Sequence, residues 1–251
     1  MTGISRLLSD LSRRHRQPEI MDAVDLPPTR FAETLKGLEI VNAVTGSSRL
    51  MWPDLKAAAR SHPDRPLRVL DVACGGGDVL IALWHKGHRA GLKLELVGCD
   101  LSPEAVRYAS DAAAKTGAPI RFFAHDVTRK PLPEGFDMIM STLFLHHLDE
   151  DNAISFLKDA AQKASDRVVI QDLTRGQLSY WFATLGTSVL LLNDICRMDG
   201  RTSVKGAFTL AEARDLARRA GLDHAEIAPR LPFRYLIRSV RHDTPRPRLS
   251  P

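Results

Sequence analysis

The chain has 251 residues, of which 44% are hydrophobic and 26% charged, with 16 glycines and 15 prolines. This composition is typical of a globular protein and excludes collagen-like, low-complexity and disordered chains. Three widely spaced cysteines exclude a disulfide framework or a zinc site, so we expect a reducing, cytoplasmic compartment. The most apolar stretch, 189–192, is far shorter than the roughly 20 residues of a membrane span, and the N-terminus lacks the apolar core of a secretory signal.

The net charge of +5 is concentrated at the two ends of the chain. Four arginines lie within residues 1–20 and six within 225–251, whereas the part between is close to neutral. A nucleic-acid-binding protein more often carries its basic residues on a central face. We therefore expect solvated termini, including a flexible basic tail at 242–251, and no nucleic-acid partner.

The first part of the chain shows helical periodicity. The leucines of 7–11 share one helical face, and a second apolar period runs over 31–42. Gly46 marks a stop, and a further helix continues toward Arg60. We expect residues 1–60 to form a helical extension that covers the acceptor site as a lid.

From Leu67 onward, short apolar strands alternate with helices, which indicates a parallel sheet covered on both faces. The predicted strands are 67–72, 94–99, 120–124, 136–141 and 167–172. Two closing strands near 225–228 and 233–240 are expected to pair antiparallel, giving a Rossmann-like, doubly wound α/β domain of seven strands over 61–241. An insertion, 175–208, breaks the rhythm with an aromatic helix around Tyr180, Trp181 and Phe182 and an expected polar turn at 199–203, and it is expected to complete the lid.

Three successive strand ends carry groups suited to a nucleoside ligand. The first strand runs into Ala73-Cys74-Gly75-Gly76-Gly77, a glycine loop that allows close approach of a ligand to the N-terminus of a helix. Asp100 ends the second strand, where a carboxylate accepts both hydroxyls of a ribose. Asp126 ends the third, where it accepts a hydrogen bond from an exocyclic amine such as that of adenine.

With these motifs, the sequence resembles the class I S-adenosylmethionine (SAM)-dependent methyltransferases over about Leu67–Leu173. The family's acid-x-Gly-x-Gly-x-Gly motif is matched by Asp71, Ala73, Gly75 and Gly77, with alanine in place of the first glycine. That replacement is tolerable if the backbone keeps φ negative at Ala73. The segment Phe136–Leu148 resembles the Leu-His-His-Leu version found in small-molecule methyltransferases related to the ubiquinone and menaquinone biosynthesis enzymes.

The resemblance implies SAM as cofactor, with S-adenosylhomocysteine as product, and a set of binding residues. Asp71 and the loop would hold the methionine part, Asp100 the ribose, and Asp126 with Val127 the adenine. The full predicted cofactor set is Asp71, Ala73, Cys74, Gly75, Gly77, Asp78, Asp100, Leu101, Asp126, Val127, Thr142 and Leu143. A nicotinamide cofactor is the remote alternative, because the third glycine of the dinucleotide fingerprint is replaced by Leu80.

Methyl transfer to a hydroxyl is helped by a base near the end of the fourth strand. His146 and His147 lie there, and a neutral imidazole is available at physiological pH. Consecutive loop residues point in different directions, so we expect at most one base and prefer His147. Asp172 and Arg175 either bind a polar substrate or cap and pair, and Arg197, Asp199 and Arg201 are expected at the surface.

No metal site is predicted. Asp126, His146 and His147 are able to ligate, but a catechol-type magnesium site needs more carboxylates at adjacent strand ends.

The sequence thus predicts a SAM-dependent methyltransferase of a small molecule, preferably at an aromatic, phenolic or polyketide-like hydroxyl in secondary metabolism. Transfer to carbon or nitrogen of a quinone-like or amine acceptor, or SAM binding without transfer, are the alternatives. The sequence does not name the acceptor, and it leaves a homodimer open.

Overall fold

The computed structural model describes residues 10–23, 25–190 and 192–241. Its strands are β1 (Leu67–Val72), β2 (Leu94–Asp100), β3 (Arg121–Ala124), β4 (Phe136–Thr142), β5 (Ala164–Leu173), β6 (Glu226–Arg230) and β7 (Arg234–Val240). Its helices are α1 (Pro28–Thr45), α2 (Ser47–Ser61), α3 (Asp78–Arg89), α4 (Pro103–Thr116), α5 (Glu150–Lys163), α6 (Gln177–Val189), α7 (Asp194–Gly206) and α8 (Leu210–Arg219). Two single 3-10 turns, η1 (Ile20–Asp22) and η2 (Leu145–His147), precede α1 and α5.

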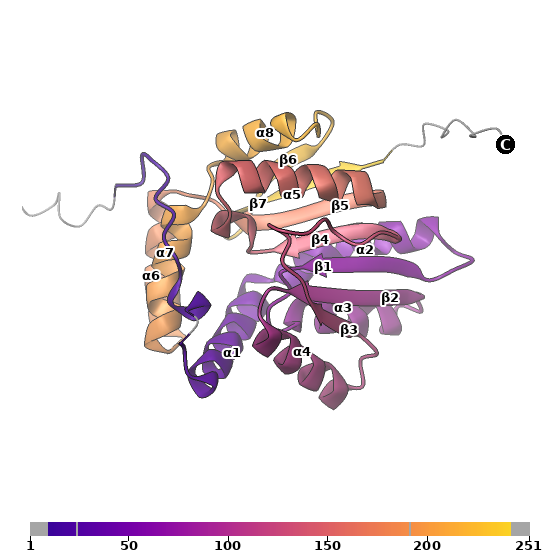
Figure 1. Cartoon of the computed structure of the whole chain (residues 1–251), viewed down its shortest axis with the longest axis horizontal. Helices are drawn as coiled ribbons and strands as arrows, with labels where there is room; N and C mark the ends of the chain where they lie inside the picture. The colour runs from indigo at the N-terminus through magenta and orange to yellow at the C-terminus, as the bar shows by residue number, and fades with distance from the viewer. Residues whose placement is uncertain (1–9, 24, 191, 242–251) are drawn as a thin grey trace, which may run out of the picture.

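The strands form one seven-stranded sheet in the order β3-β2-β1-β4-β5-β7-β6 (Figure 1). Strands β1 to β5 are parallel, and β7 runs antiparallel to both β5 and β6. The predicted doubly wound α/β fold with an antiparallel closing pair is therefore confirmed. The strand order reverses between β1 and β4, which is where open sheets of this kind bind ligands.

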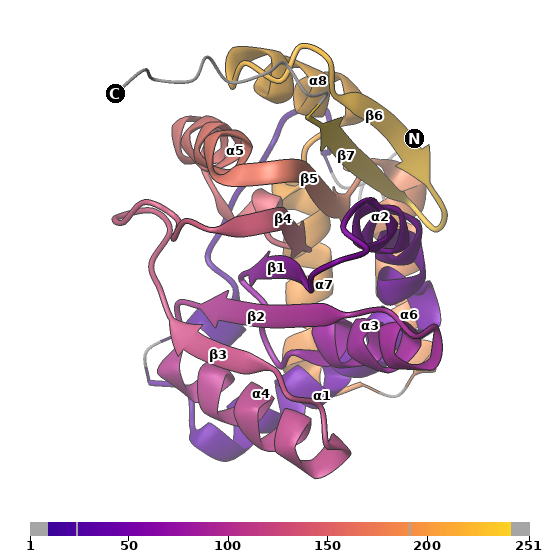
Figure 2. The same ribbon diagram turned by 90° about the vertical axis from the view of Figure 1, so that its right-hand side faces the viewer.

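Each face of the sheet packs against its own set of helices (Figure 2). One hydrophobic core lies between the sheet and α2 and α3, with Met51, Leu55 and Leu80 fully buried. The second lies between the sheet and α5 and α8, with Leu157 and Leu216 at its centre. Helices α6 and α7 pack on neither face but stand together beyond one end of the sheet, as Figure 1 shows.

The N-terminal part differs partly from expectation. Residues 7–9 of the expected first helix lie outside the described residues, and residues 10–19 form no helix. The expected helices on either side of Gly46 are present as α1 and α2, and Gly46 adopts φ 74° between them. The expected basic tail at 242–251 also lies outside the described residues.

The polar turn expected at 199–203 is wrong, because these residues lie inside α7. Asn193 caps this helix by accepting a hydrogen bond from the Cys196 amide. Asp199, expected at the surface, is buried and accepts hydrogen bonds from the amides of Ile20 and Met21 at 2.8 and 3.0 Å. The polar residues of 199–203 favour a turn locally, but Asp199 is instead buried against residues about 180 positions earlier in the chain. No helix in the described ranges is long and apolar enough to cross a membrane.

Candidate active site

A cavity of about 1240 Å³ lies at the carboxyl ends of the strands. Its floor is the glycine loop after β1 and the ends of β2, β3 and β4, and its walls include η1, α1, α6 and α7. Pockets for one small molecule usually measure about 300–1,000 Å³, so this cavity has room for a cofactor and an acceptor together. All of the residues predicted to bind the cofactor line it except Gly77, the last residue of the loop.

The glycine loop turns sharply between β1 and α3. Gly75 and Gly77 adopt positive φ values of 52° and 74°, a region that disfavours residues with a Cβ. A Cβ at Gly77 would also lie 2.9 Å from the ring of Phe122 and 3.0 Å from Ala109. Glycine is therefore required at Gly77 both by conformation and by packing.

The backbone conformation of Ala73 differs from the negative φ that the sequence analysis required there. Its φ is +55°, not negative, so the methyl group carried in place of the first glycine sits in the left-handed region. Such a conformation costs an alanine about 1 kcal/mol or more. The loop nevertheless forms its turn, and the Cys74 amide donates a hydrogen bond to the Cys99 carbonyl at 3.0 Å.

The two carboxylates at the next strand ends differ in their surroundings. Asp100 is nearly enclosed and accepts hydrogen bonds from the amides of Gly75 at 2.8 Å and Ser102 at 3.0 Å. Burial raises its pKa, although these two amides oppose the rise. Asp126 is more open, and the hydroxyl and amide of Thr128 lower its pKa. Asp100 thus couples the end of β2 directly to the glycine loop.

Asp71 and Asp78 place two further carboxyl groups at the floor of the cavity. Asp71 is fully buried, and burial together with the charges of Asp78 and Asp100 raises its pKa well above the usual range. Its Oδ1 has no hydrogen-bond partner in the described part of the chain. Burial also raises the pKa of Asp78 to about 6, against a hydrogen bond from Asn42. An unpartnered buried carboxyl group of this kind suits a ligand ammonium group.

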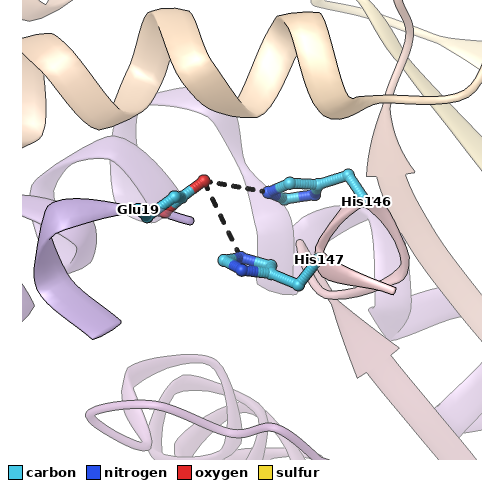
Figure 3. A group of neighbouring side chains, drawn as sticks. All are labelled: Glu19, His146 and His147. Carbon is cyan, nitrogen blue, oxygen red and sulfur yellow. Dashed lines mark ion pairs between the residues drawn. The ribbon is translucent and has the colours of Figure 1, made fainter. Parts of the chain in front are cut away.

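His146 and His147 lie on η2 after β4, and both rings point at the same carboxylate, that of Glu19 (Figure 3). The Nε2 atoms of His146 and His147 lie 3.5 and 3.9 Å from Glu19 Oε1. The expectation that the two side chains diverge is therefore not met, because the 3-10 turn brings their ring centroids to 4.3 Å. His146 is buried, whereas His147 is 26% exposed on the cavity wall.

Each histidine also has a carboxylate behind it. His146 Nδ1 lies 2.7 Å from Asp172 Oδ1, and His147 Nδ1 lies 3.3 Å from Asp22 Oδ2. Burial favours the neutral form of His146, but Asp172 and Glu19 outweigh it and raise the pKa of this ring to about 10. Burial likewise opposes the charge of Glu19, yet His146, His147 and Ser203 hold its pKa below the usual value. The two carboxylates therefore favour the charged form of the buried ring, and His147 is the more accessible of the two.

Arg175 is structural. Its guanidinium pairs with Glu212 and donates to the carbonyls of Leu11 and Ala207. The sequence analysis left two roles open for Arg175, substrate binding or capping and pairing, and these contacts match the second. Arg197 and Arg201 are not buried, in line with the surface positions expected of them.

The comparisons with known proteins agree with this geometry. Residues 69–166 match the family described as a methyltransferase domain. The ubiquinone biosynthesis O-methyltransferase of Photorhabdus laumondii is 22% identical over 126 residues, 49% of this chain and 50% of that enzyme. The demethylmenaquinone methyltransferase of Thermus thermophilus is 30% identical over 144 residues, 56% of this chain and 63% of that enzyme. The chain thus spans about half to two thirds of the length of these two relatives.

The fold is shared with solved methyltransferases. An O-methyltransferase from neocarzinostatin biosynthesis, crystallised with SAM and 2-hydroxy-5-methyl naphthoic acid, superposes with a TM-score of 0.59 at 20% identity, covering 84% of this chain and 57% of that one. Residues 69–166 are a methyltransferase domain, and the fold is that of the class I SAM-dependent methyltransferases. SAM, the predicted cofactor, is the cofactor of this class, and the nicotinamide alternative is set aside.

Two groups of residues at the methyltransferase's cavity escaped the sequence analysis. Glu19 and Asp22 lie about 125 residues before the histidines they face, in a segment without a recognisable motif. Arg234, at the start of β7, is buried and donates to the hydroxyls of Ser47 and Thr45, both at 2.6 Å. Burial lowers the pKa of Arg234 to about 10. Buried charge is not visible in a sequence, and no local signal identified these residues.

Proposed function

We propose that this protein transfers a methyl group from SAM to the hydroxyl group of a small aromatic acceptor that lies beside His147. The observation that carries this proposal is the single cavity that contains both the glycine loop with Asp100 and the Glu19–His146–His147 cluster. A methyl donor beside the glycine loop and an acceptor beside the histidine cluster would share one enclosed space.

The cofactor half of the cavity fits SAM. The unpartnered carboxyl group of Asp71 suits the ammonium group of the methionine part, and the loop from Ala73 to Gly77 leaves backbone room beside it. Asp100 accepts two amide hydrogen bonds and still has lone pairs for ribose hydroxyls. Asp126 and Val127 would border the adenine, and Cys74, Asp78, Leu101, Thr142 and Leu143 complete the walls of this half.

When bound, SAM supplies a sulfonium methyl group: the bond from acceptor oxygen to the methyl carbon forms, the carbon–sulfur bond breaks, and its electron pair stays on sulfur. The residues of this chain position the acceptor and take its proton. His147 lies on the cavity wall and is 26% exposed there, so we assign it the proton of the acceptor hydroxyl. His146, whose ring lies between Asp172 and Glu19, is a positioning residue that fixes Glu19.

The acceptor half is apolar and roofed. Side chains of α1 and α6, among them Phe31, Leu38 and Phe182, line it together with η1. We propose that η1 and α1, together with α6 and α7, act as the lid over this space, which excludes water from the reacting atoms. Helix α2, which the sequence analysis assigned to the lid, packs against the sheet instead. An aromatic ring fits such walls, and relatives named for ubiquinone and menaquinone biosynthesis support an aromatic or quinone-like acceptor.

The test is a screen of phenols and naphthols with SAM, with formation of S-adenosylhomocysteine as the readout. We expect His147→Ala to lower turnover about 100-fold or more while the Kd for SAM changes less than about twofold. Mass spectrometry and NMR of the product separate an O-methyl from a C-methyl group, the alternative for a quinone-like ring. SAM binding without turnover of any acceptor would contradict the transferase and favour a binding protein.

A further inference from the structure

We propose that Glu19, His146 and His147 bind a divalent transition-metal ion on the wall of the cavity. The three ligand atoms, one carboxylate oxygen and two ring nitrogens, lie within 4.8 Å of one another. With metal–ligand bonds of about 2.1 Å, ligand atoms stand about 3.0–3.4 Å apart. The observed separations of 3.5 and 3.9 Å from Glu19 Oε1 are close to this spacing, so small side-chain movements bring the three atoms around an ion.

The orientation of both rings supports a metal site. A histidine that binds a metal through one ring nitrogen usually donates its other N–H to a carboxylate or carbonyl. His146 Nδ1 forms such a hydrogen bond with Asp172, and His147 Nδ1 lies 3.3 Å from an oxygen of Asp22, so both rings present Nε2 to the carboxylate of Glu19 (Figure 3).

The carboxylate ligand is held as firmly as the histidines. Glu19 is 7% exposed and accepts a hydrogen bond from Ser203. The two residues after it donate their amides to the buried Asp199 on α7, which fixes the turn η1 over the cavity. The cluster brings together the carboxylates of Glu19, Asp22 and Asp172, and their negative charge favours a cation beside the two rings.

The ligand set selects the kind of ion. Imidazole nitrogens suit zinc, iron, cobalt and nickel, whereas magnesium and calcium prefer sites made of oxygens. Two histidines and one carboxylate occur both in catalytic zinc sites and in iron sites with open positions. All three ligands line the cavity, so the open positions of the ion face the acceptor. The sequence analysis predicted no metal because nothing linked Glu19 to the histidine pair.

The role of the ion rests on the proposed function, whereas the site itself rests on the geometry alone. A hydroxyl oxygen bound to a divalent cation loses its proton more readily, and solvent takes that proton as the acceptor binds, before the lid excludes water. In the metal-free protein His147 takes the proton; in the metal-bound protein its Nε2 is a ligand instead. A chelator should lower the rate of methylation if the ion activates the acceptor, and should leave the rate unchanged if His147 takes the proton, so the experiment distinguishes the two states.

The first experiment is calorimetric titration of the metal-depleted, untagged full chain with Zn²⁺, and in parallel with Mg²⁺, in the absence of SAM. We expect one Zn²⁺ per chain with a Kd of about 1 μM or lower and no binding of Mg²⁺. Glu19→Gln and His147→Gln should weaken Zn²⁺ binding at least about 100-fold. Asp22→Asn should weaken it about 10-fold or more through the ring of His147.

The matched control is His125→Gln. His125 also lines the cavity, at the end of β3, but lies outside the cluster. This variant should bind Zn²⁺ like the unchanged protein. Circular dichroism of His147→Gln shows that this variant is still folded. The Zn²⁺-dependent rise of Tm, present in the unchanged protein and absent in His147→Gln, then reports the loss of binding.

No binding of Zn²⁺, or equal binding by Glu19→Gln and His147→Gln, overturns the metal site. Methylation of a phenol in the presence of a chelator would then leave the proposed function intact with His147 as base. Conversely, Zn²⁺ binding lost in the two cluster variants establishes the site even if no phenol is methylated. Visible absorption of bound Co²⁺, altered on addition of a phenol, supports coordination of the acceptor, and an unchanged spectrum contradicts that role.

Discussion

His146 is joined to Asp172 by two hydrogen bonds: its ring Nδ1 lies 2.7 Å from Oδ1, and its backbone amide donates to Oδ2 at 2.8 Å. One carboxylate at the end of β5 therefore fixes both the ring and the backbone of the turn after β4. Because β4 and β5 are neighbours in the sheet, the positions of the two histidines are set by strand pairing rather than by the loop itself.

The first prediction concerns Asp172→Asn. The amide keeps the volume but provides only one acceptor oxygen, so η2 and the ring of His146 lose their fixed orientation. We expect kcat to fall about 10- to 100-fold, as for other residues that orient a functional histidine. The Kd for SAM should stay within about twofold. Steady-state kinetics and calorimetry measure the two effects, and equal loss of both would show that Asp172 serves folding alone.

The second prediction concerns Asp100→Ala. The carboxylate holds the Gly75 amide and faces the cavity, so its removal should weaken both the loop and ribose binding. We expect the Kd for SAM to rise about 100-fold, the loss of two hydrogen bonds to a charged group. Asp111→Ala, an exposed site on α4, is the control and should bind SAM normally. Retained affinity in Asp100→Ala would move the ribose site elsewhere.

The third prediction uses the two strained positions of the glycine loop. Ala73→Gly relieves an alanine at φ +55° and should raise the free energy of unfolding by up to about 1 kcal/mol, after the entropy cost of the new glycine. Gly77→Ala should lower it by about 2 kcal/mol, because its methyl group meets Phe122 and Ala109. Urea denaturation measures both. A destabilising Ala73→Gly would contradict the left-handed conformation at Ala73.

The fourth prediction is a pH dependence at Asp137, away from the cavity. Burial opposes the charge of this carboxyl, but Arg65, the Arg68 amide and Ser165 outweigh it and lower its pKa to about 2. The carboxylate therefore contributes stability above the unfolded-state pKa of about 3.9, and this contribution is lost as pH falls toward 2.

Asp137→Asn should accordingly lower the free energy of unfolding by about 1–2 kcal/mol at pH 7, since Arg65 is half exposed and partly screened. The difference from the unchanged protein should narrow below pH 4 and nearly vanish near pH 2. Denaturation curves between pH 2 and 7 measure it, with the exposed Asp151→Asn as control. A difference that stays constant with pH would exclude an ionised Asp137 as its source.

The fifth prediction concerns Gly186, inside α6 on the cavity wall. A Cβ at this position meets no atom within 4 Å, so Gly186→Ala should stabilise the helix by about 0.5–1 kcal/mol and leave activity unchanged. Gly186→Trp should instead fill part of the acceptor half, raising KM for the acceptor while the Kd for SAM stays constant. Unchanged acceptor kinetics in Gly186→Trp would place the acceptor away from α6.

The order of the seven strands and of the helices between β1 and β5, and the acids at the ends of β1 to β3, followed from the sequence alone. The reason is that chain order forces successive parallel strands to end at one edge of a sheet, so Asp71, Asp100 and Asp126 had to lie near one another. The glycine loop and the antiparallel closing strands carry local signals of the same kind. These features depend on residues within a few positions of each other.

Only the tertiary structure decided which groups face the histidines. Glu19 and Asp22 reach them from the N-terminal segment, and Asp199 was misread as a surface turn residue because its partners are the distant amides of Ile20 and Met21. The positive φ of Ala73 was likewise not visible in the sequence, because an alanine by itself favours negative φ. Contacts between segments far apart in the chain depend on how the elements pack, and no periodicity or spacing along the sequence encodes them.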